Sequence, residues 1–131
     1  AYQELAEFLS IPAGARRTAR GALPEDHALS YKASYRRRLF DEADLIVMVG
    51  MRAGELESWF EAPDWPRGDV QYVQINETPG ELWLGLPSVE MLVGSANLVL
   101  RQLLDTAKAR LGDKPVARDA WLRTLKEARE R

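Results

Sequence analysis

Few residues in this chain have the chemistry for catalysis, and the single histidine is the first to consider. His27 follows Glu25 and Asp26 in a segment that also contains Gly21 and Pro24. A Glu-Asp-His cluster could bind a metal ion, but one histidine needs further ligands from elsewhere in the fold. The chain has no cysteine, which excludes thiolate nucleophiles, disulfides and cysteine-ligated metals. A metal site is therefore the less favoured interpretation of this cluster.

A second candidate is the acidic segment of residues 55–64, which carries Glu55, Glu57 and Glu61. Paired carboxylates can serve as general acid and base, so a stand-alone enzyme that works through these residues is one hypothesis. The chain has no GxSxG elbow, no GxGxxG turn and no Walker loop to supply the rest of an active site. The simpler interpretation is a long solvated loop whose two tryptophans pack against a neighbour.

A third candidate is the polar turn that follows an unbroken apolar run, Leu45–Val49. Such a run without alternation is typical of a parallel strand that is buried on both faces. Gly50 allows a sharp turn at the end of this strand, and Arg52 follows it. Ligands bind at the carboxyl ends of strands in open α/β sheets, so Arg52 is the residue that we expect to contact a bound anion.

The elements that would position these residues alternate between helix and strand. Apolar spacing predicts helices over residues 2–9, 35–43, 96–111 and from 119 onward, and strands over residues 11–15, 45–49, 70–75 and 88–93. Glutamines 71 and 74 predict a partly exposed third strand, and Gly112 predicts the end of the long helix. This order predicts an α/β fold with an open parallel sheet of about four strands and helices on both faces, in a Rossmann-like or flavodoxin-like order.

Size and composition are those of one soluble globular domain. The 131 residues are 46% hydrophobic and 29% charged, with a net charge of −2, so no global basic field would attract nucleic acid. Arg16, Arg17 and Arg20 could hold a phosphate, although solvated arginines are the more common case. No stretch resembles a signal peptide or a membrane span, so the cytoplasm is the expected location.

Four runs in this order resemble the middle domain of thiamine-diphosphate-dependent enzymes, the group of acetolactate synthase, oxalyl-CoA decarboxylase, benzaldehyde lyase and relatives of pyruvate oxidase. The runs are Gly-Ala-Leu-Pro-Glu-Asp-His at residues 21–27, Ala-Asp-Leu-Ile-Val-Met-Val-Gly-Met-Arg at 43–52, Val-Gln-Ile-Asn-Glu at 73–77 and Val-Gly at 93–94. The resemblance predicts a middle domain over residues 1–111 that lacks the family's first strand. It also predicts a linker over 112–118 and a helix over 119–131 that leads toward a C-terminal catalytic domain.

The resemblance also implies what the chain does. In this family the thiamine diphosphate and Mg²⁺ of the parent enzyme, a decarboxylase or carboligase acting on a 2-keto acid or an acyl-CoA, are held by the N- and C-terminal domains. We therefore expect no catalytic and no metal-binding residue here, no cofactor held by this chain alone, and a structural role in subunit interaction. The expected partners are other domains or subunits in a homo-oligomer, with no nucleic acid and no membrane.

The alternative is a nucleotide-binding module. Middle domains bind FAD in the acetolactate synthase branch and ADP in oxalyl-CoA decarboxylase. The resemblance places Gly50 and Arg52 in the stretch that touches the flavin nucleotide, and Asn76 and Glu77 where an acidic residue holds the adenosine ribose. The predicted nucleotide site is thus Gly50, Arg52, Asn76 and Glu77.

Overall fold

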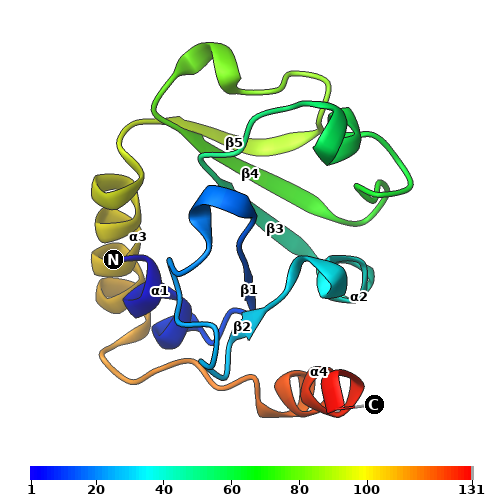
Figure 1. Ribbon diagram of the computed structural model, residues 1–131. Coiled ribbons are helices and arrows are strands. Elements are labelled where there is room, and N and C mark those ends of the chain that lie inside the picture. The colour runs from blue at the N-terminus through cyan, green and yellow to red at the C-terminus, as the bar shows by residue number, and fades with distance from the viewer. Residues whose placement is uncertain (131) are drawn as a thin grey trace. The chain divides into compact units, whose positions relative to one another are not determined.

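The computed structural model describes residues 1–130, with the backbone alone at Leu56, and these residues form two compact units (Figure 1). The first unit consists of Ala1–Leu39 together with the chain from Leu100 onward, and the second is Phe40–Val99. Every strand pair is parallel and strands alternate with helices, which confirms the predicted open α/β class. Within residues 1–130, no helix has the length and apolar character needed to span a bilayer.

In the first unit a short parallel pair lies beside α1 (Tyr2–Leu9). It consists of β1 (Ala13–Gly14) and β2 (Ser30–Tyr31), with Ala13 opposite Ser30. The strand predicted over residues 11–15 is therefore only two residues long, since Pro12 has no N–H to donate to a ladder. β2 was not predicted because two residues without an apolar run carry no periodic signal, and the described chain has five strands rather than four.

The helices end close to where their sequences predict. A 3₁₀ turn over Ala33–Tyr35 leads into α2 (Arg36–Asp41), which is shorter than the predicted helix. The other two are α3 (Ala96–Leu111) and α4 (Asp119–Glu130). Gly112 ends α3 as predicted, with φ +81° and its N–H donating to the Lys108 carbonyl at 2.9 Å.

The segment between α3 and α4 is held against α1. The Val116 N–H donates to the Phe8 carbonyl at 2.8 Å, and the Ser10 hydroxyl donates to the Val116 carbonyl at 2.6 Å. The Arg118 Nε donates to the Leu9 carbonyl at 2.9 Å, at the carboxyl end of α1. Leu122 of α4 then packs against a buried cluster of the first unit that contains Ala6, Leu23 and Leu29. The segment is thus anchored to α1 at Val116 and Arg118.

The second unit is built on a three-stranded parallel sheet, β3–β4–β5 (Figure 1). The strands are β3 (Leu45–Val49), β4 (Gln71–Asn76) and β5 (Ser88–Val93), and the register shifts between Tyr72 and Val73 where β4 meets β5. One face of the sheet carries the main buried cluster of this unit, which contains Ile46, Met48, Phe60, Trp65, Tyr72 and Leu86.

Burial of β3 on both faces was predicted and is wrong. Ile46 and Met48 are buried, but Leu45 and Val47 between them are 46% and 40% exposed. Alternate side chains of a strand point to opposite faces, and only the face of Ile46 and Met48 meets the loop that follows β3. An apolar run in the sequence shows that both faces of a strand are hydrophobic. It does not show whether other elements cover both faces.

The long loop after β3 packs as a small aromatic layer. Trp65 is 1% exposed, and its ring lies 4.8 Å from that of Phe60 and 5.2 Å from that of Phe40, between centroids. Trp59 is exposed, and the Trp83 ring lies beside it at 6.3 Å between centroids. Packing was predicted for both tryptophans, and the structure gives Trp65 a place in the core and Trp59 a surface contact.

Candidate functional site

The predicted binding residues lie where β3 and β4 end. Gly50 directly follows β3 at φ +65°, a conformation that glycine adopts without a steric penalty. Its N–H donates to the Ile75 carbonyl of β4 at 2.8 Å, and a Cβ built on Gly50 would meet no heavy atom within 4 Å. The turn after β3 is thus fixed by a ladder bond on one side and open on the other.

Asn76, the last residue of β4, links three turns at this edge of the sheet. Its side chain is 9% exposed, its Nδ2 donates to the Met51 carbonyl at 3.1 Å, and its Oδ1 accepts from the Thr78 N–H at 3.1 Å. The Asn76 carbonyl accepts from the N–H of Gly94, just after β5, at 3.0 Å. Asn76 therefore holds the segments that follow all three strands. Its Nδ2 and its Oδ1 each retain one further hydrogen-bonding position.

Arg52 and Glu77 are the accessible members of the predicted site. The Arg52 side chain is 76% exposed, and its Nε lies 3.7 Å from the Glu81 Oε1 in the turn after β4. Exposed ion pairs contribute little to stability, so Arg52 can exchange this carboxylate for another anion at small cost. Glu77 follows Asn76 and its side chain is exposed. The structure thus brings a positioned amide and an exposed cation to one edge of the sheet.

Gln74 was predicted to be partly exposed, and this is wrong. Its side chain is buried, with Nε2 donating to the Trp83 carbonyl and to the Ser88 hydroxyl, both at 2.9 Å. Its Oε1 accepts from the Trp83 N–H at 2.7 Å. These bonds offset the cost of burying an amide and hold the loop after β4 against the sheet. The sequence shows only a polar residue inside an apolar strand. It does not show which groups will form hydrogen bonds with the Gln74 side chain, and those bonds decide whether it can be buried.

The Glu-Asp-His cluster is spread over separate contacts. The His27 Nδ1 accepts from the Leu29 N–H at 3.1 Å, which leaves the ring proton on Nε2, 3.0 Å from the Glu7 Oε1. Glu25 instead forms an ion pair with Arg20. Across residues 1–130, no three His, Asp or Glu side chains come close enough together to hold a metal ion. His27 ties its loop to α1.

A second carboxylate on α1 joins that helix to α3. The Arg101 guanidinium makes two hydrogen bonds to the Glu4 carboxylate, one of them 3.2 Å long, and the amino group of Ala1 lies 3.1 Å from the same side chain. These hydrogen bonds, that of Arg101 first, lower the pKa of Glu4 from its ordinary 4.5 to about 2.

This pKa predicts an acid-dependent loss of stability. A depressed carboxyl pKa stabilises the folded state fully above the unfolded pKa and progressively less as pH falls from 4.5 toward 2. Arg101→Gln should lower the urea midpoint at pH 7, and its difference from the wild type should shrink between pH 4.5 and 2. Urea unfolding at pH 7, 4 and 2.5 measures this. A difference that stays constant with pH would show that Arg101 acts by packing alone.

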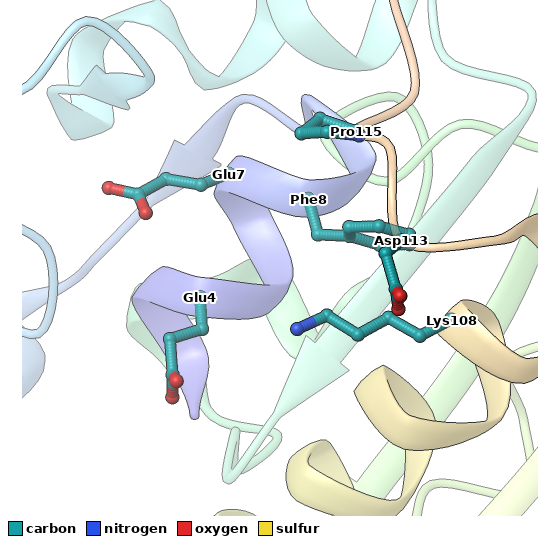
Figure 2. Close-up of a pocket in the computed structure, with 6 residues that line it drawn as sticks. All are labelled: Glu4, Glu7, Phe8, Lys108, Asp113 and Pro115. Carbon is teal, nitrogen blue, oxygen red and sulfur yellow. The ribbon is translucent and has the colours of Figure 1, made fainter.

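A shallow hollow of about 260 Å³ lies beside this contact (Figure 2). Its lining residues are Glu4, Glu7, Phe8, Lys108, Asp113 and Pro115. The Lys108 ammonium lies 5.8 Å from the centre of the Phe8 ring, a cation–π distance, and Figure 2 shows the lysine extending toward α1. Glu4 and Glu7 already have partners in Arg101 and His27. The hollow is therefore best explained as the space left where α1 packs against the end of α3.

A known family model matches most of this chain. The model of the thiamine pyrophosphate enzyme central domain matches residues 1–103. The chain belongs to this family. A search of curated proteins found no significant match. The central-domain match confirms the resemblance inferred from the sequence runs, and it includes Gly50, Arg52, Asn76 and Glu77.

Membership in the central-domain family implies thiamine diphosphate as the cofactor of the enzyme that contains this domain. Binding that cofactor requires Mg²⁺ ligands and a cradle for the diphosphate. Among the described residues, no three His, Asp or Glu side chains come together where they could hold a metal ion. The residues at this edge do not fit a Mg²⁺–diphosphate site, so no catalytic step is assigned to them.

Proposed function

We propose that this chain acts as the non-catalytic central domain of a thiamine-diphosphate-dependent decarboxylase or carboligase, a lyase or transferase of the acetolactate synthase-like type. The parent enzyme would use Mg²⁺ and a 2-keto acid or acyl-CoA substrate in the cytoplasm. The observation that carries the proposal is the central-domain match over residues 1–103.

The structural role would be to contact other domains or subunits of a homo-oligomeric enzyme. Support comes from the second unit, where large apolar side chains remain exposed on strands, on loops and on the first turn of α3. They are Leu45, Val47, Trp59, Leu84, Val89, Val93 and Leu98. Exposed apolar side chains that gather into a patch mark interaction surfaces.

The proposal predicts that the chain alone does not bind thiamine diphosphate. Calorimetric titration of the 131-residue chain with thiamine diphosphate and Mg²⁺ should give no saturable heat, because no described group of side chains could coordinate the ion. Micromolar binding would contradict the proposed division of labour between domains.

The alternative function is binding of ADP or FAD at the edge formed by the ends of β3 and β4. The observation that favours it is the open turn at Gly50 beside the exposed side chains of Arg52 and Glu77. Arg52 would meet the phosphates as a charge-assisted donor, and Glu77 would accept from the ribose hydroxyls. Asn76 would keep the three turns in register beneath them.

A thermal-shift titration with ADP and with FAD tests this alternative. A ligand at 100 times its Kd should stabilise the chain by about 2.7 kcal/mol. Arg52→Ala should weaken ADP about tenfold or more, as expected for a lost charge-assisted bond. Arg123→Ala, which removes one exposed charge from α4 in the other unit, is the matched control and should leave the affinity unchanged. Equal affinities in the two variants would exclude Arg52 as the anion ligand.

A further inference from the structure

The charge of this chain is divided unevenly between its two units. The second unit, Phe40–Val99, has 11 Asp and Glu residues against 2 Lys and Arg residues, a net charge of −9. The first unit, Ala1–Leu39 with the chain from Leu100 onward, has 16 Lys and Arg residues against 9 Asp and Glu residues, a net charge of +7. The net charge of −2 is therefore the sum of two large and opposite charges. Surfaces of opposite charge attract each other and associate faster than neutral ones.

The loop after β3 presents an exposed aromatic side chain between carboxylates. Trp59 is 52% exposed, and Glu55 and Glu61, which flank it in the sequence, are exposed as well. The Trp83 ring lies 6.3 Å from the Trp59 ring between centroids, and Leu84, the next residue, is 86% exposed. Glu55, Trp59, Glu61 and Leu84 are called the acidic aromatic patch below. Because tryptophan is among the residues most enriched at binding hot spots, Trp59 is the natural centre of a contact with another chain.

The backbone that carries Trp59 is fixed from the core side of the loop. Phe60 is 0% exposed, and its carbonyl accepts from the Arg67 Nη2 at 2.7 Å. The Glu57 carbonyl accepts from the Nε1 of the buried Trp65 at 2.7 Å. Trp59 lies between these two carbonyls at φ +50°, a left-handed conformation that a bulky residue adopts where the surrounding structure imposes it. A backbone that is ordered before binding lowers the entropy cost of docking.

The first unit contains an exposed basic segment, residues 108–126, which runs from the last turn of α3 into α4. It has six Lys and Arg residues against two Asp residues, and all six cations are exposed. They are Lys108, Arg110, Lys114, Arg118, Arg123 and Lys126. The segment is also ordered, because its backbone and Arg118 bond to carbonyls at the end of α1. It therefore presents several cations from a fixed backbone.

We propose that the acidic aromatic patch of one copy of this chain docks the basic segment 108–126 of a second copy. A Lys or Arg side chain of the segment stacks on the Trp59 ring, and Glu55 and Glu61 pair with neighbouring cations. A second copy is the favoured occupant because the chain itself carries the complementary charge, +7 on one unit against −9 on the other. The inference rests on the structural role proposed above and names the two surfaces through which copies meet.

Sedimentation equilibrium of the 131-residue chain at about 50 mM and about 0.5 M NaCl tests this contact. The chain should self-associate at low salt, and the Kd should rise about tenfold or more at high salt because exposed charges are screened. Trp59→Ala and Glu55→Gln/Glu61→Gln should each weaken self-association about tenfold or more at low salt. The matched control Asp69→Asn/Glu90→Gln removes two exposed carboxylates from the same unit and should associate as the wild type does. Unfolding curves of each variant verify that it folds.

A mixing experiment gives the sharper result, because it distinguishes two complementary surfaces from one surface that pairs with itself. Arg110→Gln/Lys114→Gln should weaken self-association as the patch variants do. Lys32→Gln/Arg37→Gln, which removes two exposed cations of the same unit outside the segment, should not. The segment variant keeps the patch, and Glu55→Gln/Glu61→Gln keeps the segment. An equimolar mixture of these two variants should therefore associate more tightly than either variant alone.

Four results would overturn the proposal. They are a chain that stays monomeric at low salt, self-association that is insensitive to salt, equal losses in the matched controls, and a mixture no tighter than its components. Polylysine that binds a monomeric chain, with an affinity that Trp59→Ala reduces, would assign the patch to a different basic partner and would also overturn it. The thiamine diphosphate titration tests the proposed division of labour between domains separately, so the two proposals fail in different experiments.

Discussion

Trp65→Ala should destabilise the second unit by about 3–5 kcal/mol, the range measured when a buried aromatic side chain is truncated to alanine. Trp65 is 1% exposed, and Phe60 packs edge-on against it. Its Nε1 donates to the Glu57 carbonyl at 2.7 Å. Domains of this size have total stabilities of about 5–15 kcal/mol, so the loss is a large fraction of the whole. Chemical unfolding followed by circular dichroism should show a much lower midpoint.

Two matched variants separate packing from hydrogen bonding at this position. Trp65→Phe keeps an aromatic ring beside Phe60 but loses the donor to the Glu57 carbonyl, so its loss should be smaller than that of alanine. Trp59→Ala removes an exposed tryptophan from the same loop and should cost little. Similar losses in Trp59→Ala and Trp65→Ala would contradict the assignment of Trp65 to the core.

Asn76→Leu should cost about 1–3 kcal/mol for each backbone group that loses its partner. The Met51 carbonyl and the Thr78 N–H would both be left without the amide that now bonds them. Leucine has the same number and branching of side-chain heavy atoms as asparagine but cannot form hydrogen bonds, so the variant removes both bonds while keeping the shape of the side chain. Urea unfolding measures the change in stability, and amide hydrogen exchange should show faster exchange at Thr78.

Asn76→Asp is the control for this second prediction. An aspartate still accepts from the Thr78 N–H, but a carboxylate cannot donate to the Met51 carbonyl. Its stability should fall between those of the wild type and the leucine variant, and it should recover at low pH where the protonated acid can donate. A leucine variant as stable as the wild type would show that water replaces the amide at both turns.

Local sequence signals determined the elements with strong periodicity. The apolar stripe of α3 and the glycine after it set where that helix lies and ends, because a helix face and a left-handed cap are local properties. The apolar run of β3 likewise set a strand, and the order of elements set a parallel sheet. The runs that identified the central-domain family were readable for the same reason, since each is a short contiguous stretch.

Tertiary structure alone decided the partners of individual side chains. β2 exists because Ser30 and Tyr31 pair with β1, and a two-residue ladder has no period of its own. Gln74 is buried because Trp83 and Ser88 satisfy its amide, and Leu45 is exposed because only the other face of β3 meets the aromatic loop. Composition and spacing determined which elements form; which polar groups meet is set by contacts between segments that are distant in the chain.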